Sequence, residues 1–245
     1  MVEGYTKARP PVHPYVLERV RERLGLTMPI SRALDVGCGA GLSTSPLRGI
    51  AGFCLGIDPI EAMVHGSPAA VIGVRFAAAR AEALPVRSAS IDIITAAGSL
   101  NFADLDQFFP DAVRVLRDGG ALIVYDFSAG RRFVDSDVLD AWFTEFLRRY
   151  PKDEGAAVAL DPESLAAAAA GFTLAGSEEF EVALRMDQVA YCNYLVTEMN
   201  VAHAIARGED SAAIHAWLES ALDDVFEGTA HEVLFAGYLA HFVPA

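Results

Sequence analysis

The sequence predicts a doubly wound, Rossmann-like α/β fold with a mostly parallel seven-stranded sheet, an antiparallel edge hairpin and a helical lid inserted into that hairpin. Short apolar runs rich in Val and Ile alternate with helical patterns as far as residue 127. This alternation is typical of a parallel sheet that is covered on both faces. Beyond residue 127, two long strand-like segments flank a helical stretch, which favours an antiparallel edge.

The first half of the chain supplies the predicted parallel strands. They cover residues 32–37, 52–58, 71–77, 90–99 and 121–127. A helix is predicted from Pro10 to about Leu26, because Val16, Val20 and Leu24 recur at helical spacing. A second helix is expected after Pro110 and ends at the Gly-Gly pair before residue 121.

The second half is predicted to contain longer strands and more helices. Helices are expected at residues 137–150 and 162–170, and strands at 172–184 and 231–243. Between these strands, residues 189–203 and 214–225 each show an apolar stripe at helical spacing. We therefore expect one domain over residues 1–245, with a ligand-binding core at about 30–128 and a helical insertion at about 186–228.

Composition excludes several kinds of partner. The formal net charge of −14 argues against nucleic acid, whose binders carry basic stripes that release counterions. No apolar stretch reaches the roughly 18 to 20 residues that span a bilayer, and the first residues lack a secretory signal. Cys38, Cys54 and Cys192 show no metal-ligand spacing. We expect no membrane contact, no metal, and a reducing, cytoplasmic location.

A glycine-rich turn follows the first predicted strand in "ALDVGCGAGLSTSPL", with glycines at Gly37, Gly39 and Gly41. Such a turn lets the backbone approach a ligand, and the following helix offers free amides. A dinucleotide fingerprint would need glycine at residue 42, which is Leu42, and the Gly-Lys-Ser/Thr end of a P-loop is absent.

Four stretches in order carry a resemblance to a known family: "LDVGCGAG", "GIDPIEAM", "ARAEALPVRSASIDIITAA" and "AVRVLRDGGALIVYDF". In sequence and spacing they resemble the motifs of class I S-adenosylmethionine-dependent methyltransferases, from about residue 32 to 127. The resemblance implies S-adenosyl-L-methionine as cofactor, with S-adenosyl-L-homocysteine as product. It also implies the Rossmann-like fold of that family.

By this resemblance, the glycine turn lies against the methionine portion of the cofactor, and Asp58 takes the two ribose hydroxyls. A carboxylate suits a cis-diol because it accepts two charge-assisted hydrogen bonds. Ala81 and Glu82 would border the adenine. The implied cofactor-binding residues are Tyr5, Arg9, Asp35, Gly37, Cys38, Gly39, Gly41, Asp58, Pro59, Met63, Ala81, Glu82, Gly98 and Ser99.

The opening "YTKARPPVHPYVLERV" resembles the Tyr–x–x–x–Arg–Pro start of a subgroup that includes trans-aconitate methyltransferase-like enzymes. The resemblance implies that Tyr5 and Arg9 cover the site, with Arg9 available to the cofactor carboxylate. The alternative is an exposed terminus with no such role. Two departures stand out: Arg80 occupies a position that is commonly acidic, and Asn101 and Phe102 replace a frequent His–Trp pair.

The catalytic residues are not identified by the sequence. Candidates for the acceptor pocket are Asn101, Phe127, Tyr191, Tyr194 and His203. Each has a structural alternative: Tyr191, Tyr194 and His203 lie on apolar helical stripes, where packing is the common role. Asn101 can hydrogen-bond but cannot act as a base near neutral pH.

Three function classes follow. The first is methyl transfer to a small-molecule acceptor, an O-, N- or C-nucleophile, by in-line displacement, in a monomer or homodimer. The second is a non-catalytic protein that binds S-adenosylmethionine or S-adenosylhomocysteine with a retained fold. The third is a nicotinamide oxidoreductase, which Leu42 disfavours.

Overall fold

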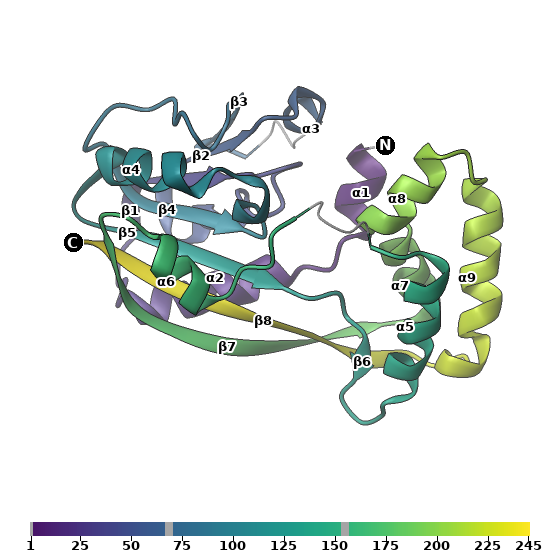
Figure 1. Cartoon of the computed structure of the whole chain (residues 1–245). Helices are drawn as coiled ribbons and strands as arrows, with labels where there is room; N and C mark the ends of the chain where they lie inside the picture. The colour runs from purple at the N-terminus through teal and green to yellow at the C-terminus, as the bar shows by residue number, and fades with distance from the viewer. Residues whose placement is uncertain (1, 67–70, 153–156) are drawn as a thin grey trace.

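The computed structural model describes residues 2–66, 71–152 and 157–245, and its centre is a mixed eight-stranded sheet (Figure 1). The strand order is β3-β2-β1-β4-β5-β8-β6, with β7 paired along β8. The first five strands pair in parallel, and β8 pairs antiparallel with β5, β6 and β7. The doubly wound α/β class with an antiparallel edge is confirmed.

Most strand bounds follow the predicted runs closely, but β5 begins at Leu116, before the predicted start at residue 121, so the Gly-Gly pair lies inside this strand and does not end the preceding helix. They are β1 (Ile30–Val36), β2 (Ala51–Asp58), β3 (Val74–Ala78), β4 (Ile91–Ala97), β5 (Leu116–Phe127), β6 (Arg132–Phe133), β7 (Phe172–Met186) and β8 (His231–Pro244). The predicted number of seven strands is wrong, because the two-residue strand β6 also pairs with β8, at Leu234 and Val233. So short a strand has no hydrophobic alternation from which it could be predicted.

Helices cover both faces of the sheet (Figure 1). Their bounds are α1 (Val2–Ala8), α2 (Val12–Arg23), α3 (Glu61–His65), α4 (Leu105–Val115), α5 (Val138–Arg149), α6 (Pro162–Ala168), α7 (Gln188–Leu195), α8 (Met199–Ala206) and α9 (Ser211–Phe226), with 3-10 turns η1 (Pro46–Gly49) and η2 (Leu100–Phe102). Buried residues of α2 and α5 belong to one core cluster, and those of α4 and α6 belong to another. In the described part of the chain, no helix is long and apolar enough to cross a membrane.

Helix α4 begins earlier than its sequence predicts. It starts at Leu105, and Pro110 lies inside it rather than before it. The Asp104 carboxylate caps the helix by accepting from the amides of Asp106 and Gln107 at 3.1 and 3.3 Å. Pro110 and Asp106, whose carbonyl loses its partner in the previous turn, are both exposed residues, so the interruption costs less than in a buried helix.

The helical insertion between β7 and β8 is the second difference. The single helix predicted at residues 189–203 is two helices, α7 and α8, separated by three residues that end at Glu198. Glu198 is extended, with φ −68° and ψ 144°. Apolar spacing continues across the break because both helices pack into the same core, so periodicity alone does not reveal it. We call α7–α9 (residues 188–226) the lid.

The N-terminal segment is helical and docked. Figure 1 shows α1 beside the lid, far from the C-terminus of the chain, and α1 contacts α7. The lid helices and α5 gather at one end of the molecule, where α9 contacts both α5 and α7. Residues far apart in the sequence, at 2–8 and 188–206, are thereby neighbours.

Gly237 allows β8 to lie close to its two neighbours. Its register partners are Phe127 on β5 and Phe180 on β7. A Cβ at this position would come within 2.8 Å of Phe127 Cβ and of Phe180 Cζ, and it would overlap the backbone oxygen of Asp126. Real Cβ atoms do not approach so closely, so any side chain here forces the strands to shift.

We predict that Gly237→Ala lowers the free energy of unfolding by about 1–3 kcal/mol, the usual cost of overpacking a close-packed region. Urea unfolding followed by far-UV circular dichroism measures this change. Gly49→Ala is the control, because nothing lies within 4 Å of a Cβ there. Equal stabilities of the two variants would contradict the prediction.

Candidate active site

The glycine turn joins β1 to the segment before η1 and lies at the carboxyl edge of the sheet. Gly37 has φ +72°, and a Cβ on it would overlap Ser99 Cβ and come 2.8 Å from Ser99 Oγ. Only glycine fits this left-handed, crowded position. The amides of Gly37 and Cys38 donate to the Ile57 carbonyl at 2.8 and 2.9 Å, which ties the turn to the end of β2.

Asp58, the last residue of β2, fixes the other side of this turn. Its Oδ2 accepts from the Gly39 amide at 2.9 Å, and its Oδ1 accepts from the Ile60 amide at 2.8 Å. Each carboxylate oxygen keeps further acceptor capacity beyond one such bond. Met63 on α3 lies on the same side, since a Cβ on Gly39 would come 3.6 Å from its Cε. Pro59 is exposed beside it.

Asp35 lies beneath the turn and is fully buried. Its Oδ2 accepts from Ser43 Oγ and Thr44 Oγ1, both at 2.6 Å, and its Oδ1 accepts from Thr95 Oγ1 at 2.9 Å. Burial raises the pKa of Asp35, and the three hydroxyl hydrogen bonds oppose that rise. Asp35 thus supports the turn from below, and its direct contact with a ligand stays a prediction.

Cys38 adds packing rather than reactivity to the turn. The thiol is buried, 3.6 Å from the Gly39 carbonyl. Burial and then the charges of Asp35 and Asp58 raise its pKa far above the usual range. A thiol held neutral in this way is a poor nucleophile.

The predicted adenine border contains a small network. Glu82 accepts from the Asp104 amide at 3.0 Å and from Arg80 Nε at 3.2 Å. The Asp104 amide, more than Arg80, lowers the pKa of Glu82. Arg80, the departure from the family pattern, is therefore paired with Glu82, and Ala81 lies half-buried beside that pair.

The loop after β4 lies against the glycine turn, on the side that faces β5. Ser99 donates from Oγ to the Val36 carbonyl at 2.6 Å. Gly98 has φ +58°, and a Cβ on it would come 2.8 Å from Asp126 Oδ1. The two residues therefore connect the glycine turn of β1 with the end of β5. The structure brings Gly37, Ser99, Gly98 and Asp126 into one continuous edge.

Arg9 joins the N-terminal segment to the lid. Its Nη1 donates to Glu198 Oε1 and its Nη2 to the Thr197 carbonyl, both at 2.8 Å. The guanidinium carbon lies 4.9 Å from the ring centre of Tyr5 and 5.5 Å from that of Tyr194. The break between α7 and α8 presents these acceptors. The role of Arg9 and Tyr5 toward a cofactor stays a prediction.

Two of the acceptor-pocket candidates are in the core of the lid. Tyr191 is fully buried and donates from its hydroxyl to the Gly130 carbonyl at 2.6 Å. Tyr194 is buried and packs edge-on against Phe235, with ring centres 5.9 Å apart. These contacts agree with the alternative role in packing that the helical spacing of the two tyrosines suggested. His203 lies half-buried on α8.

The end of β5 carries groups on both faces, because successive strand residues point to opposite sides. On the α2 face, His13 Nδ1 lies 2.9 Å from the Tyr125 hydroxyl, and its ring meets Phe127 edge-on at 5.4 Å between centres. On the other face lies Asp126, with the Asn101 side chain hydrogen-bonded to its carboxylate. Asp126 was not among the predicted site residues. The signal that identified Asp58, an acid at a strand end, also marks Asp126.

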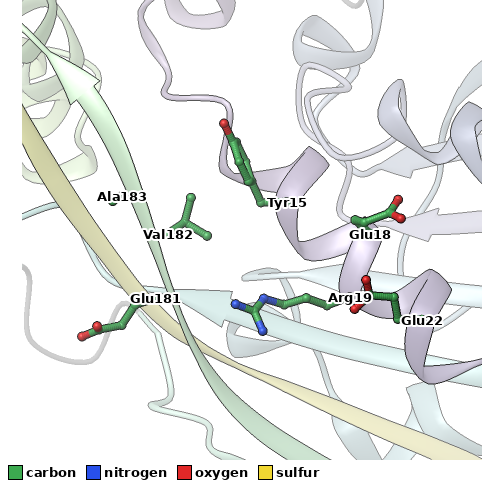
Figure 2. A pocket seen from close by; sticks show the side chains of 7 residues that line it. All are labelled: Tyr15, Glu18, Arg19, Glu22, Glu181, Val182 and Ala183. Atoms are coloured by element: carbon green, nitrogen blue, oxygen red, sulfur yellow. The ribbon is translucent and has the colours of Figure 1, made fainter.

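Two open grooves lie outside this edge. One, of about 410 Å³, runs between α2 and β7 and is lined by Tyr15, Glu18, Arg19, Glu22, Glu181, Val182 and Ala183. Figure 2 shows Arg19 extending from the helix toward the strand, whereas Glu181 points from the strand away from the helix. The other, of about 1160 Å³, follows β7 and β8 as far as Tyr238. Neither groove is lined by the glycine turn or by Asp58.

The sequence comparisons agree with this geometry. Residues 34–124 match the family model described as a methyltransferase domain. The chain is 32% identical over 101 residues to the methyltransferase YcgJ of Bacillus subtilis, a match that covers 39% of this chain and 40% of that protein. It is 33% identical over 139 residues to the ubiquinone/menaquinone biosynthesis C-methyltransferase UbiE of Acidiphilium cryptum, covering 54% of each chain. The matches span about half or less of the length of these curated relatives.

Solved structures extend the similarity over the whole fold. A protein of Anaeromyxobacter dehalogenans assigned as a type II methyltransferase has a TM-score of 0.68 and 24% identity, with 91% of this chain and 94% of that chain covered. Together with the matched domain, this confirms the predicted resemblance. Residues 34–124 match a methyltransferase domain, and the chain as a whole shares the Rossmann-like fold of that solved structure.

We predict that Arg9→Gln loosens the lid, because it removes an ion pair and a charge-assisted bond in which the Arg9 and Glu198 side chains are only 24% and 17% exposed. The expected loss is about 1–2 kcal/mol of unfolding free energy. Faster amide hydrogen exchange is expected in residues 188–206. Arg132→Gln is the control, because its pair with Glu181 is 49% and 56% exposed and such pairs contribute little. The same exchange rates in both variants would refute the role.

We predict that His13 makes stability fall in mild acid. Burial, and then the charge of Arg9, lower the pKa of His13 from 6.5 to about 4. The unfolded chain therefore binds the extra proton first, and the contribution of His13 is complete above pH 6.5 and is lost as the pH falls toward 4. Urea unfolding across this range should show a flatter pH dependence for His13→Gln than for the wild type. The control is His65→Gln, at an exposed site, whose stability should depend on pH as that of the wild type does. A His13→Gln variant with the same pH dependence of stability as the wild type would contradict this role of His13.

Proposed function

We propose that this protein is an S-adenosylmethionine-dependent methyltransferase that acts on a small-molecule acceptor. The observation that carries the proposal is the Asp58 carboxylate bound to the Gly39 amide at 2.9 Å. This bond holds a diol-binding acid and a glycine turn side by side at the carboxyl edge of a parallel sheet. Ligands bind at that edge in open α/β folds.

The residues at this edge fit the cofactor. Gly37, Gly39 and Gly41 carry no side chains, so a ligand can approach the main chain of the turn closely. Asp58 retains acceptor capacity on both oxygens for the ribose hydroxyls. Glu82 and Ala81 lie half-buried where the adenine is expected. Arg9 and Tyr5 would cover the site together with the lid.

When bound, S-adenosylmethionine supplies an activated methyl group, so the protein needs to align the acceptor and exclude water. The lid and α1 are placed for exclusion, since Arg9 fastens them to each other through Glu198 and Thr197. Support for a small acceptor comes from the net charge of −14, which disfavours a nucleic-acid substrate.

The names of the relatives support the same class without fixing the nucleophile. One matched relative is a C-methyltransferase of ubiquinone/menaquinone biosynthesis, and another, from Sinorhizobium fredii, is a ubiquinone biosynthesis O-methyltransferase.

Cys38, Cys54 and Cys192 are all free and buried, which supports a reducing, cytoplasmic location.

We predict that Asp58→Asn weakens binding of S-adenosylhomocysteine about 10- to 100-fold, because a charge-assisted bond to a hydroxyl is worth about 1.5–3 kcal/mol. Asparagine keeps one acceptor for the turn, so the fold is expected to persist. Isothermal titration calorimetry measures the affinity, and Asp118→Asn, an exposed carboxylate at the start of β5, serves as the control.

Two results would sink the proposal. The first is wild-type protein that binds neither S-adenosylmethionine nor S-adenosylhomocysteine. The second is cofactor binding without methyl transfer to any member of a broad panel of small phenols, carboxylates, amines and carbon acids. The second result would favour a non-catalytic binding protein. Unchanged affinity of Asp58→Asn for S-adenosylhomocysteine would refute only the ribose-binding role of Asp58 and would leave the proposed function standing.

A further inference from the structure

Asp126 is a half-buried carboxylate at the end of β5, on the β5 side of the glycine turn. Its Oδ1 accepts from the Phe127 amide at 2.8 Å, and the Asn101 side chain donates to the same carboxylate. Tyr238 is its direct partner on β8. The three side chains belong to the loop after β4, to β5 and to β8, so the fold has assembled them from distant parts of the chain.

Asp35 and Asp92, two buried carboxylates of the described chain, have evident structural roles. Asp35 ties β1 to β4 and to the segment after the glycine turn through three hydroxyls. Asp92 pairs with Arg117 and accepts from the Arg32 amide at 2.7 Å. Asp126 instead accepts from the amide of its own chain neighbour and from one loop side chain. Removing its charge would disconnect no pair of strands.

Its position relative to the turn is what gives Asp126 a chemical role. Gly98 lies against it, so that a Cβ on Gly98 would stand 2.8 Å from Oδ1. The next residue, Ser99, lies against Gly37 of the glycine turn. A ligand on that turn would therefore have its nearest carboxylate on the β5 side at Asp126, while Asp58 lies on the β2 side.

We propose that Asp126 is the catalytic base that accepts the proton of a hydroxyl acceptor, with an aromatic hydroxyl as the substrate class. The aromatic class is inferred from two rings, that of Tyr238, the register partner of Asp126 on β8, and that of Phe102 on the η2 turn. Phe102 is 55% exposed although it is a large apolar residue, and Tyr238 lines the groove along β8. The inference rests on the proposed methyltransferase function.

In the proposed step, the acceptor oxygen forms a bond to the methyl carbon while the bond between that carbon and the sulfonium sulfur breaks. The electron pair of the broken bond stays on sulfur, which becomes a neutral thioether. The hydroxyl proton passes to the Asp126 carboxylate. Charge balances, because the cationic donor and the anionic carboxylate both become neutral, and no further reactant is needed.

The electrostatics around Asp126 suit a base. Burial raises its pKa, while the Phe127 amide, Asn101 and the exposed Lys152 oppose the rise. A carboxylate with a raised pKa accepts a proton more readily than an ordinary one. The facing groups on the packed elements are Tyr238, whose pKa burial and the charge of Asp126 raise, and Asp161 beyond Tyr238. Methyl transfer is therefore expected to rise with pH as Asp126 loses its proton.

The first test is spectroscopic and independent of turnover. We would bind 4-nitrophenol to the whole 245-residue chain saturated with S-adenosylhomocysteine and follow the ionisation of the probe by absorbance. The Asp126 charge disfavours the phenolate, so the bound probe should ionise at higher pH in the wild type than in Asp126→Asn. Glu179→Gln is the matched control, because it removes an exposed carboxylate on β7 opposite Tyr238, and it should behave as the wild type.

The second test measures methyl transfer to a panel of phenols by mass spectrometry. Asp126→Asn should lower kcat by about 10²- to 10⁴-fold, the range of general base catalysis, and should remove the acidic limb of the pH profile. Its affinity for S-adenosylhomocysteine should stay within about twofold of the wild type, by calorimetry. Asn101→Leu keeps the carboxylate but removes a donor, so its acidic limb should move to higher pH. This variant also serves if Asp126→Asn does not fold.

The outcomes separate the two levels of inference. Wild-type protein that fails to bind S-adenosylhomocysteine overturns the methyltransferase function itself. Wild-type protein that binds S-adenosylhomocysteine but does not bind 4-nitrophenol, or that methylates only amines such as benzylamine, overturns the assignment of a hydroxyl acceptor. Full kcat with a wild-type pH profile in Asp126→Asn overturns the role of Asp126 and leaves the proposed function standing.

Discussion

The buried carboxylate of Asp35 is the interaction on which the candidate site depends. It is fully buried, yet three hydroxyls from Ser43, Thr44 and Thr95 saturate it. These bonds join β1, β4 and the segment after the glycine turn at one point. A buried carboxylate is costly unless it is hydrogen-bonded in this way, so the geometry that satisfies Asp35 is also the geometry that holds the turn. The turn can then place its backbone toward a ligand.

The edge above Asp35 is asymmetric, and the asymmetry follows from strand order. β1 lies between β2 and β4, and β4 lies between β1 and β5. Asp58, at the end of β2, therefore flanks the turn on one side, and Asp126, at the end of β5, flanks it on the other. The two acids have different surroundings. Asp58 accepts from the backbone amides of Gly39 and Ile60. Asp126 instead lies beside Asn101 and Tyr238.

The lid combines an aromatic core with a few polar contacts to the N-terminal segment. Tyr191, Tyr194 and Phe226 pack against one another within the lid, so its interior is aromatic and apolar. Its link to the N-terminal segment is polar and runs through Arg9 to Glu198 and Thr197. A charge-assisted link of this kind breaks at lower cost than a packed aromatic cluster. Movement of the lid against α1 is thus easier than unfolding of the lid.

The sequence by itself determined which segments form the parallel strands, where the glycine turn lies, and which acid ends β2. Each of these features is a local pattern of a few residues. It also indicated a helical insertion between the last strands. It failed where the pattern was too short, as in β6, or was continuous across an interruption, as between α7 and α8. In α4, the capping carboxylate of Asp104 outweighed the proline on which the sequence-based boundary rested.

Tertiary structure alone decided which polar groups meet. Arg9 is 189 residues from Glu198, and Asp126 finds Asn101 and Tyr238 only once β5 lies between β4 and β8. No local pattern encodes such partners, since strand pairing and helix docking bring them together from separate segments. The sequence therefore specified where the methyl donor is expected to bind, and the sheet edge formed by folding specified where the acceptor is proposed to meet a base.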